Sequence, residues 1–177
     1  IETSNGYNNL SQVLDSDKDT NLISKVQYGH FDYCLDSNLW PFPDPNHIEF
    51  WDIIKPMIEV ISNHGKVYLH TPFPFPNNSE LFWSSTIYLS NLMPKLDFWA
   101  TTLNHDLSLS EFPENPSDLK PSFLIKDHER LIEKARNISD SYYEGRANKR
   151  SFGVSSTRFI PPHQVFAAMK FLESIDK

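Results

Sequence analysis

The side chains most able to do chemistry stand where two predicted strands end. Cys34 and Asp36 lie two residues apart at the end of the first strand, and Thr71 ends the second. Side chains two residues apart on an extended chain point to the same side. A nucleophile and a proton carrier placed in this way can divide attack and proton transfer on one substrate. Because ligands bind at the carboxyl ends of parallel strands, the sequence predicts a site at this edge.

The stretch around this pair resembles the first motif of the haloacid-dehalogenase-type (HAD) phosphatases, most closely the small magnesium-dependent ones. The family has Phe-Asp-Leu-Asp-x-Thr-Leu-Trp-Pro where this chain reads Tyr33-Cys34-Leu35-Asp36-Ser37-Asn38-Leu39-Trp40-Pro41-Phe42. The resemblance implies that Asp36 is the general acid and base and that Cys34 occupies the position of the nucleophile. Asn38 replaces the usual threonine beside the phosphate. The resemblance covers about residues 24–176.

The same resemblance implies roles for three further residues. Thr71 would hydrogen-bond the phosphate, Lys126 would balance its charge, and Asp140 would join Asp36 in holding Mg²⁺. Mg²⁺ is the one cofactor implied. By strict spacing, however, Leu124 stands where the family has its lysine, and one acid of the pair at Asp140 is missing.

The nucleophile position is the most serious departure from the family. A thiol at Cys34 offers no hard oxygen to Mg²⁺, and the loss of one member of a catalytic unit removes most of the rate. We therefore expect a degenerate phosphatase-like domain that is not an enzyme and acts as a binding or scaffold module with protein partners. The alternative is a weakly active magnesium-dependent phosphatase. Cys34 itself is interpreted as a small, buried apolar residue.

A different class of enzyme fits some of the same acids. Asp36, Glu80 and Asp97, together with Asn38, resemble the sparse acid pattern of PIN-type metal-dependent nucleases. In such a site, converging carboxylates hold Mg²⁺ for phosphodiester hydrolysis. The net charge of −7 disfavours a nucleic-acid partner, because the phosphate backbone is bound by clustered Lys and Arg.

An alternation of strands and helices must position these residues. Apolar patterning predicts strands at residues 22–35, 66–71, 96–103 and 152–159, and helices near residues 46–63, 79–93, 123–138 and 161–175. Strands connected through helices form a mainly parallel sheet. The expected fold is α/β, with a three-layer, Rossmann-like sheet of the HAD type and helices on both faces.

The remaining sequence features concern organisation and setting. Residues 1–21 predict a polar N-terminal arm, and residues 22–177 predict a single domain with a long surface loop at 104–122. One cysteine rules out an internal disulfide and fits a reducing compartment. No apolar run approaches the ~18 residues of a membrane span. We expect an intracellular protein, cytoplasmic or nuclear, without a membrane partner. The start at Ile1 indicates a piece of a longer chain.

Overall fold

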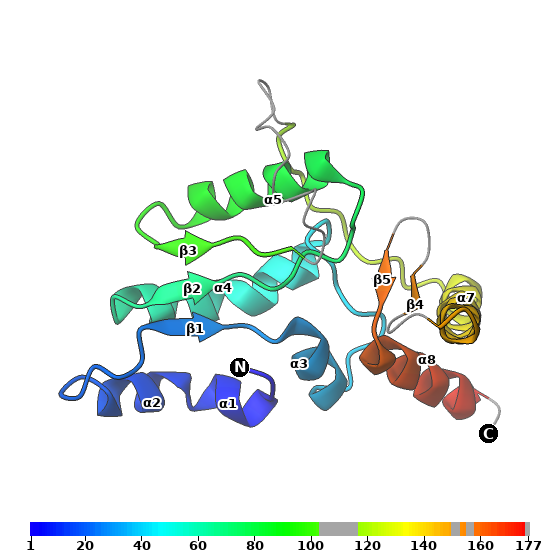
Figure 1. Ribbon diagram of the computed structural model, residues 1–177, viewed down its shortest axis with the longest axis horizontal. Coiled ribbons are helices and arrows are strands. Elements are labelled where there is room, and N and C mark those ends of the chain that lie inside the picture. Colours follow the sequence, from blue (N-terminus) through cyan, green and yellow to red (C-terminus); the bar gives the residue numbers. More distant parts are fainter. Residues whose placement is uncertain (103–116, 150–152, 155–157, 176–177) are drawn as a thin grey trace.

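The computed structural model describes residues 1–102, 117–149, 153–154 and 158–175 (Figure 1). A small parallel sheet with its helices comes first, and two long helices with a short hairpin follow. The helices are α1 (Ser4–Asn8), α2 (Leu10–Ser16), α3 (His30–Asp36), α4 (Ile48–Asn63), α5 (Ser79–Leu92), α7 (His128–Ala147) and α8 (Pro162–Ile175). The strands are β1 (Lys25–Gln27), β2 (Val67–Leu69), β3 (Phe98–Trp99), β4 (Gly153–Val154) and β5 (Phe159–Ile160).

The parallel sheet has the order β1-β2-β3, so each strand is added beside the previous one. Val26 pairs with Tyr68, and Tyr68 pairs with Phe98. The chain passes through α3 and α4 between β1 and β2, and through α5 between β2 and β3, because parallel neighbours need a long crossover. In Figure 1, α2, α4 and α5 surround one side of the strands, and no helix crosses in front of them.

The main core lies between the sheet and α4. Apolar residues recur every three or four positions along α4 and form one continuous face. Its buried members are Phe50, Trp51, Ile54, Met57, Ile58 and Ile61. This face packs on Val26, Tyr28 and Tyr68.

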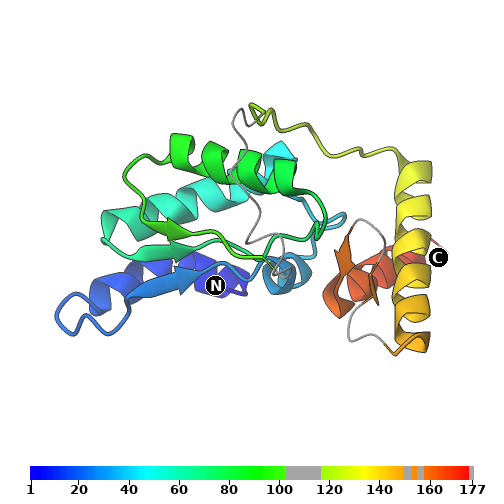
Figure 2. The same cartoon turned by 45° about the horizontal axis from the view of Figure 1, so that its top comes forward.

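A second core joins α7, β5 and α8. Its buried residues are Ala135, Ile138, Ile160, Val165 and Ala168. Figure 2 shows α8 between the sheet and α7, and α8 packs against both α3 and α7.

The other face of the parallel sheet is not covered by the described residues. Side chains alternate along a strand, so Lys25, Gln27 and Trp99 are exposed on this face, and Val67 and Leu69 are half-buried. The Lys25 ammonium lies 3.6 Å from the centre of the Trp99 ring, within cation–π distance. All-parallel sheets are ordinarily covered on both faces, so this uncovered face is an unusual feature.

The general α/β class is confirmed, whereas the three-layer HAD-type arrangement is not. The strand predicted at 152–159 is corrected to the short strands β4 and β5, which pair antiparallel and do not join the parallel sheet. α7 begins later than predicted and continues to Ala147. Most of the surface loop predicted at 104–122 lies outside the described residues. Among the helices that are described, none is long and apolar enough to cross a membrane.

The first predicted strand is largely wrong. β1 ends at Gln27 and α3 covers His30–Asp36, so Cys34 and Asp36 lie on a helix and not on a strand. His30 and Cys34 are four residues apart and are both buried on α3. The same apolar residues fit an alternating pattern and a helical one, and a short run does not distinguish the two periods.

The prediction of a loose N-terminal arm is also wrong. Residues 4–16 form α1 and α2, and Leu10 and Leu14 of α2 are buried in the main core. The backbone N–H of Gly29 donates to the Ile1 carbonyl at 2.8 Å, which holds the N-terminal segment beside the end of β1. Two leucines four residues apart suffice to bury one side of a short helix, although the segment is polar on average.

A buried ion pair ties the end of α2 to the start of β2. Lys66 donates from Nζ to Asp17 Oδ2 at 2.9 Å, and both side chains are less than one-tenth exposed. The Asp17 carboxylate also accepts backbone hydrogen bonds from Leu22 and Ile23, so it organises the turn that leads into β1. The hydrogen bond from Lys66 is the main reason that the pKa of Asp17 falls to about 2.

This pair predicts an acid-sensitive contribution to stability. Folding lowers the Asp17 pKa from 3.8 to about 2. The charged carboxylate therefore stabilises the fold above about pH 4, and this contribution is lost as the pH falls towards about 2. We expect Asp17→Asn to lower the free energy of unfolding at pH 7 and to flatten its pH dependence in that window. Urea denaturation at several pH values measures both effects. Asp19→Asn is the exposed control, and an unchanged slope in the Asp17 variant contradicts the assignment.

The N-terminal helices predict a second stability effect. Leu14 is 1% exposed, whereas its neighbour Val13 is 47% exposed. We expect Leu14→Ala to lower the free energy of unfolding by about 2–5 kcal/mol, because it removes buried apolar contacts and leaves a cavity. Val13→Ala should change it by no more than about 0.5 kcal/mol. Equal effects in denaturant titrations would mean that α2 does not dock on the core.

Candidate active site

All three parallel strands end at one edge of the sheet, which is where parallel β/α enzymes bind their ligands. Tyr28 directly follows β1, and His70 and Thr71 directly follow β2. Thr101, just beyond β3, donates from its hydroxyl to the His70 carbonyl at 2.6 Å. In Figure 1, α3 lies at this end of β1. Polar groups from three strands therefore meet at the carboxyl edge.

Buried rings fill the space at this edge. The ring of Phe50 packs edge-on against His30 and His70, with centres 5.3 Å and 5.8 Å apart. The two imidazoles are 1% and 5% exposed. Burial is the main reason that the pKa of His30 falls to about 4 and that of His70 to about 3. Both imidazoles are therefore neutral at pH 7 and contribute packing and hydrogen bonding rather than charge.

An arginine–carboxylate pair joins this edge to the second core. Arg158, directly before β5, donates from both terminal nitrogens to Asp44, and its Nη2 lies 2.6 Å from Oδ1. Asp44 is 2% exposed, and its backbone N–H donates to Nδ1 of His47 at 3.0 Å. Two parallel charge-assisted bonds fix distance and orientation together. The pair therefore helps to set where α7 and α8 stand relative to the sheet.

A second pair, Asp32 and His163, lies at the rim of the same edge. Asp32 is in the first turn of α3, and His163 is at the start of α8. His163 Nε2 lies 2.8 Å from Asp32 Oδ1, and the side chains are 34% and 47% exposed. The His163 ring also stacks on Phe31, with centres 6.5 Å apart. Asp32 is thus a partly exposed carboxylate, held by an imidazole, on the helix that follows β1 and five residues beyond the end of that strand. A carboxylate held in this way can serve as an acid–base group.

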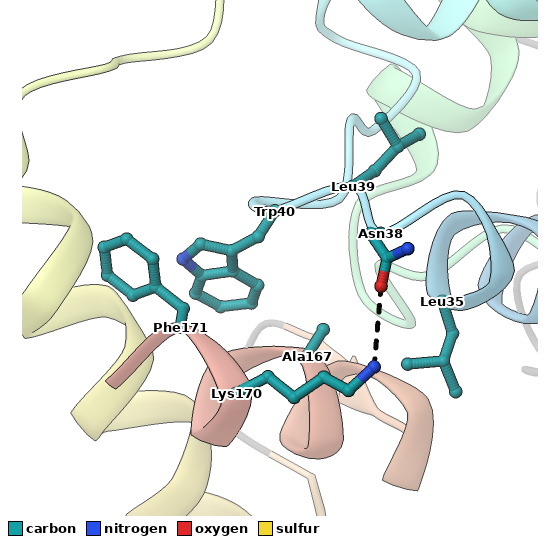
Figure 3. A pocket seen from close by; sticks show the side chains of 7 residues that line it. All are labelled: Leu35, Asn38, Leu39, Trp40, Ala167, Lys170 and Phe171. Atoms are coloured by element: carbon teal, nitrogen blue, oxygen red, sulfur yellow. Dashed lines mark hydrogen bonds between the residues drawn. The ribbon is translucent and has the colours of Figure 1, made fainter. Parts of the chain in front are cut away.

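A small apolar pocket opens between the end of α3 and α8 (Figure 3). Its volume is about 190 Å³, below the ~300 Å³ of typical ligand sites. Leu35, Trp40 and Phe171 line it, and Lys170 Nζ lies 3.5 Å from Asn38 Oδ1 beside it. Its polar lining consists of Asn38 and Lys170, and no carboxylate or imidazole lines it.

The structure does not bring the predicted nucleophile and acid together. On α3, Cys34 and Asp36 are rotated about 200° from one another around the helix axis. Cys34 is fully buried, and burial raises the pKa of its thiol to about 12. Asp36 points elsewhere and accepts the Ser4 backbone N–H at 2.7 Å. Asn38, with φ of 51°, lies beyond the end of α3 and contacts Lys170.

The other predicted residues are scattered. Thr71 reaches the carboxyl edge, where it is 1% exposed and its hydroxyl is buried without a hydrogen bond in the described residues. Lys126 is exposed just before α7, and Asp140 is exposed on α7. Asp36 ends α3 and Asp140 is on α7, and α8 packs against both of these helices.

The predicted metal site gains no support from this arrangement. Across the described part of the chain, no three acidic, histidine or cysteine side chains come together in a group that could hold a metal ion. Neither the Mg²⁺ ligands Asp36 and Asp140 nor the nuclease-type acids Glu80 and Asp97 therefore belong to such a group.

Sequence reasoning missed Asp32 and His163. The signal for Asp32 is a carboxylate in the first helical turn after a buried strand, and it becomes visible only when β1 ends at Gln27. His163 follows the two prolines that open α8. Its partner is far away in sequence, so no local pattern indicates the pair.

No family model matches this chain, and no curated protein matches its sequence. Among solved structures, the fold is similar to a Haloferax volcanii malate synthase in a ternary complex with pyruvate and acetyl-CoA, which is a TIM-barrel enzyme. The TM-score is 0.58 and the sequence identity is 16%. The match covers 99% of this chain and 52% of that chain, so this chain spans about half the length of the malate synthase.

This similarity bears on the fold, and it corrects the HAD resemblance. In the described residues the sheet runs β1-β2-β3 without a further strand beside β1, and β5 pairs only with β4. The motif around Cys34 and Asp36 is on a helix rather than at a strand end. The roles that the resemblance implied for these residues therefore lose their structural basis. The fold is similar to about half of a TIM-barrel enzyme, not to a HAD phosphatase.

Proposed function

We propose that this chain is part of an enzyme that makes or breaks a carbon–carbon bond beside a carbonyl group. The proposed substrates are a small 2-oxo acid and an acyl thioester. The observation that carries the proposal is Asp32, a partly exposed carboxylate that His163 holds at the carboxyl edge of the parallel sheet. The malate synthase with a similar fold was solved with pyruvate and acetyl-CoA, and extending that class of substrate to this chain is part of the proposal.

The proposed chemistry assigns one role to each member of the pair. The Asp32 carboxylate takes a proton from the carbon beside the thioester carbonyl. The electron pair left behind forms the new bond to the carbonyl carbon of the oxo acid, whose oxygen then takes up a proton. Water then attacks the thioester carbonyl and the carbon–sulfur bond breaks, which gives a carboxylic acid and the free CoA thiol. His163 orients the carboxylate through the contact at 2.8 Å. A positioned general base of this kind typically contributes a factor of about 10²–10⁴ to the rate.

The position of Asp32 supports this role better than that of any residue in the predicted phosphatase motif. In β/α enzymes, catalytic groups stand at the carboxyl ends of the strands and in the loops that follow them. Asp32 occupies such a position, whereas Cys34 is fully buried. We place this enzyme inside the cell, because the one cysteine of the sequence suits a reducing compartment.

The test is the release of free CoA thiol from acetyl-CoA in the presence of pyruvate or glyoxylate, the smallest 2-oxo acids. We expect thiol release that depends on the oxo acid, and a fall of at least about a hundredfold in kcat for Asp32→Asn. His163→Gln should lower kcat less, because it removes orientation and leaves the carboxylate in place.

Asp36→Asn is the matched control, since it makes the same change on the same helix at a carboxylate that contacts Ser4 instead. It should keep kcat within about twofold of the parent protein. Thiol release that does not depend on the oxo acid, or an Asp32 variant as active as the Asp36 variant, would reject the proposal.

A binding module is the second candidate function, and the uncovered sheet face favours it. Trp99 is 56% exposed on that face, beside half-buried Val67 and Leu69. A parallel sheet face that exposes an aromatic ring beside aliphatic side chains is suited to packing against further protein. We expect Trp99→Lys to leave the thiol assay unchanged and to abolish any association that sedimentation detects.

A further inference from the structure

A polar cleft that shares no lining residue with the Asp32–His163 pair lies between α7 on one side and Arg158 and Ile160 on the other. Its volume is about 410 Å³, within the range of small-molecule sites. Two buried apolar side chains, Ile138 and Ile160, contribute to its lining. The cleft is therefore large enough for more than a single ion and has an apolar part.

One face of α7 supplies most of the polar lining. Arg130, Lys134, Asn137 and Ser141 all line the cleft, and they follow one another at spacings of four, three and four residues. This spacing keeps them on one side of a helix, over a length of roughly 16 Å at 1.5 Å per residue. All four can donate hydrogen bonds, so the cleft presents a row of donors.

The charged side chains that line the cleft carry an excess of positive charge. Arg130, Lys134 and Arg158 are cationic, and Glu133 is the acid in the lining. Asp44 behind the cleft pairs with Arg158. Three cations and two carboxylates leave one positive charge in a protein whose net charge is −7.

The charged form of Lys134 is disfavoured at its position beside the cleft. Burial is the main cause that lowers the pKa of Lys134, and Arg158 lowers it further, although Asp44 acts in the opposite direction. An anion in the cleft would relieve both the desolvation and the repulsion from Arg158.

We propose that this cleft binds a phosphate-bearing small molecule of about the size of a nucleoside diphosphate. A row of ammonium, guanidinium, amide and hydroxyl donors suits several phosphate oxygens spread along the helix. The apolar residues Ile138 and Ile160 suit the uncharged part of such a ligand. This site is separate from the Asp32–His163 pair and does not depend on the chemistry assigned to that pair.

Calorimetric titration with ADP, pyrophosphate, adenosine and citrate tests the site. We expect ADP and pyrophosphate to bind, and adenosine and citrate to bind at least about tenfold more weakly. The double variant Arg130→Gln/Lys134→Gln should weaken ADP binding by at least about tenfold, because it removes two charge-assisted hydrogen bonds. Arg136→Gln makes the same kind of change at an exposed position of α7 outside this cleft, and it should alter binding by less than about twofold.

Circular dichroism melting of each variant confirms that the fold is kept. No binding of ADP at millimolar concentration would overturn the proposal, as would citrate binding as tightly as pyrophosphate. A double variant that is folded and binds ADP like the parent protein would also overturn it. None of these outcomes depends on thiol release, so this site and the proposed enzyme activity can fail separately.

Discussion

The contact between Asp44 and Arg158 is the constraint on which the arrangement of the carboxyl edge depends. Asp44 sits in a stiff, proline-rich turn on the sheet side, and Arg158 leads into β5 on the other side. A backbone hydrogen bond from Phe159 to the Pro74 carbonyl reinforces the junction at 2.9 Å. Because a buried charge left alone is costly, neither partner can be removed without disturbing the other.

The features of the site follow from this junction. It places α8 against α3, and this packing brings His163 to Asp32. It also places Arg158 in the lining of the cleft beside α7. The Asp44–Arg158 ion pair therefore contributes both to the Asp32–His163 pair and to that cleft. Beside this ion pair, a smaller apolar cluster of Cys34, Phe42 and Ala167 packs α8 against α3 and lies between the two larger cores.

The sequence predicted the elements whose pattern is long and regular. α4 has a full apolar face over 16 residues. It ends at Asn63, two residues before Gly65, whose φ of 61° uses the freedom of glycine to adopt positive φ. The short helices α2 and α3 were missed because their apolar patterns are too short to identify a helix. α3 has seven residues, too few to separate a helical from an alternating pattern. α2, also of seven residues, docks mainly through Leu10 and Leu14.

The site could be predicted only in outline, because it depends on the short segment whose helical structure the sequence did not reveal. The carboxyl edge was expected to hold it, and Thr71 does lie there. The assignment of Cys34 and Asp36, however, depended on an extended backbone that the chain does not adopt. Asp32 is only two residues before Cys34. Where β1 ends and α3 begins determines which of the two side chains is exposed at the carboxyl edge of the sheet. The partner of Asp32 comes from tertiary packing, which one sequence does not show.

The burial of Cys34 has a practical consequence for studying this protein. It is the only cysteine of the sequence and is 0% exposed. Burial raises the pKa of its thiol to about 12, so it stays protonated and poorly nucleophilic at neutral pH. Maleimide reagents will therefore pass over the native residue. A cysteine introduced on the surface becomes the single reactive thiol, so fluorescent or spin labels can be attached at one chosen position without first removing the natural cysteine.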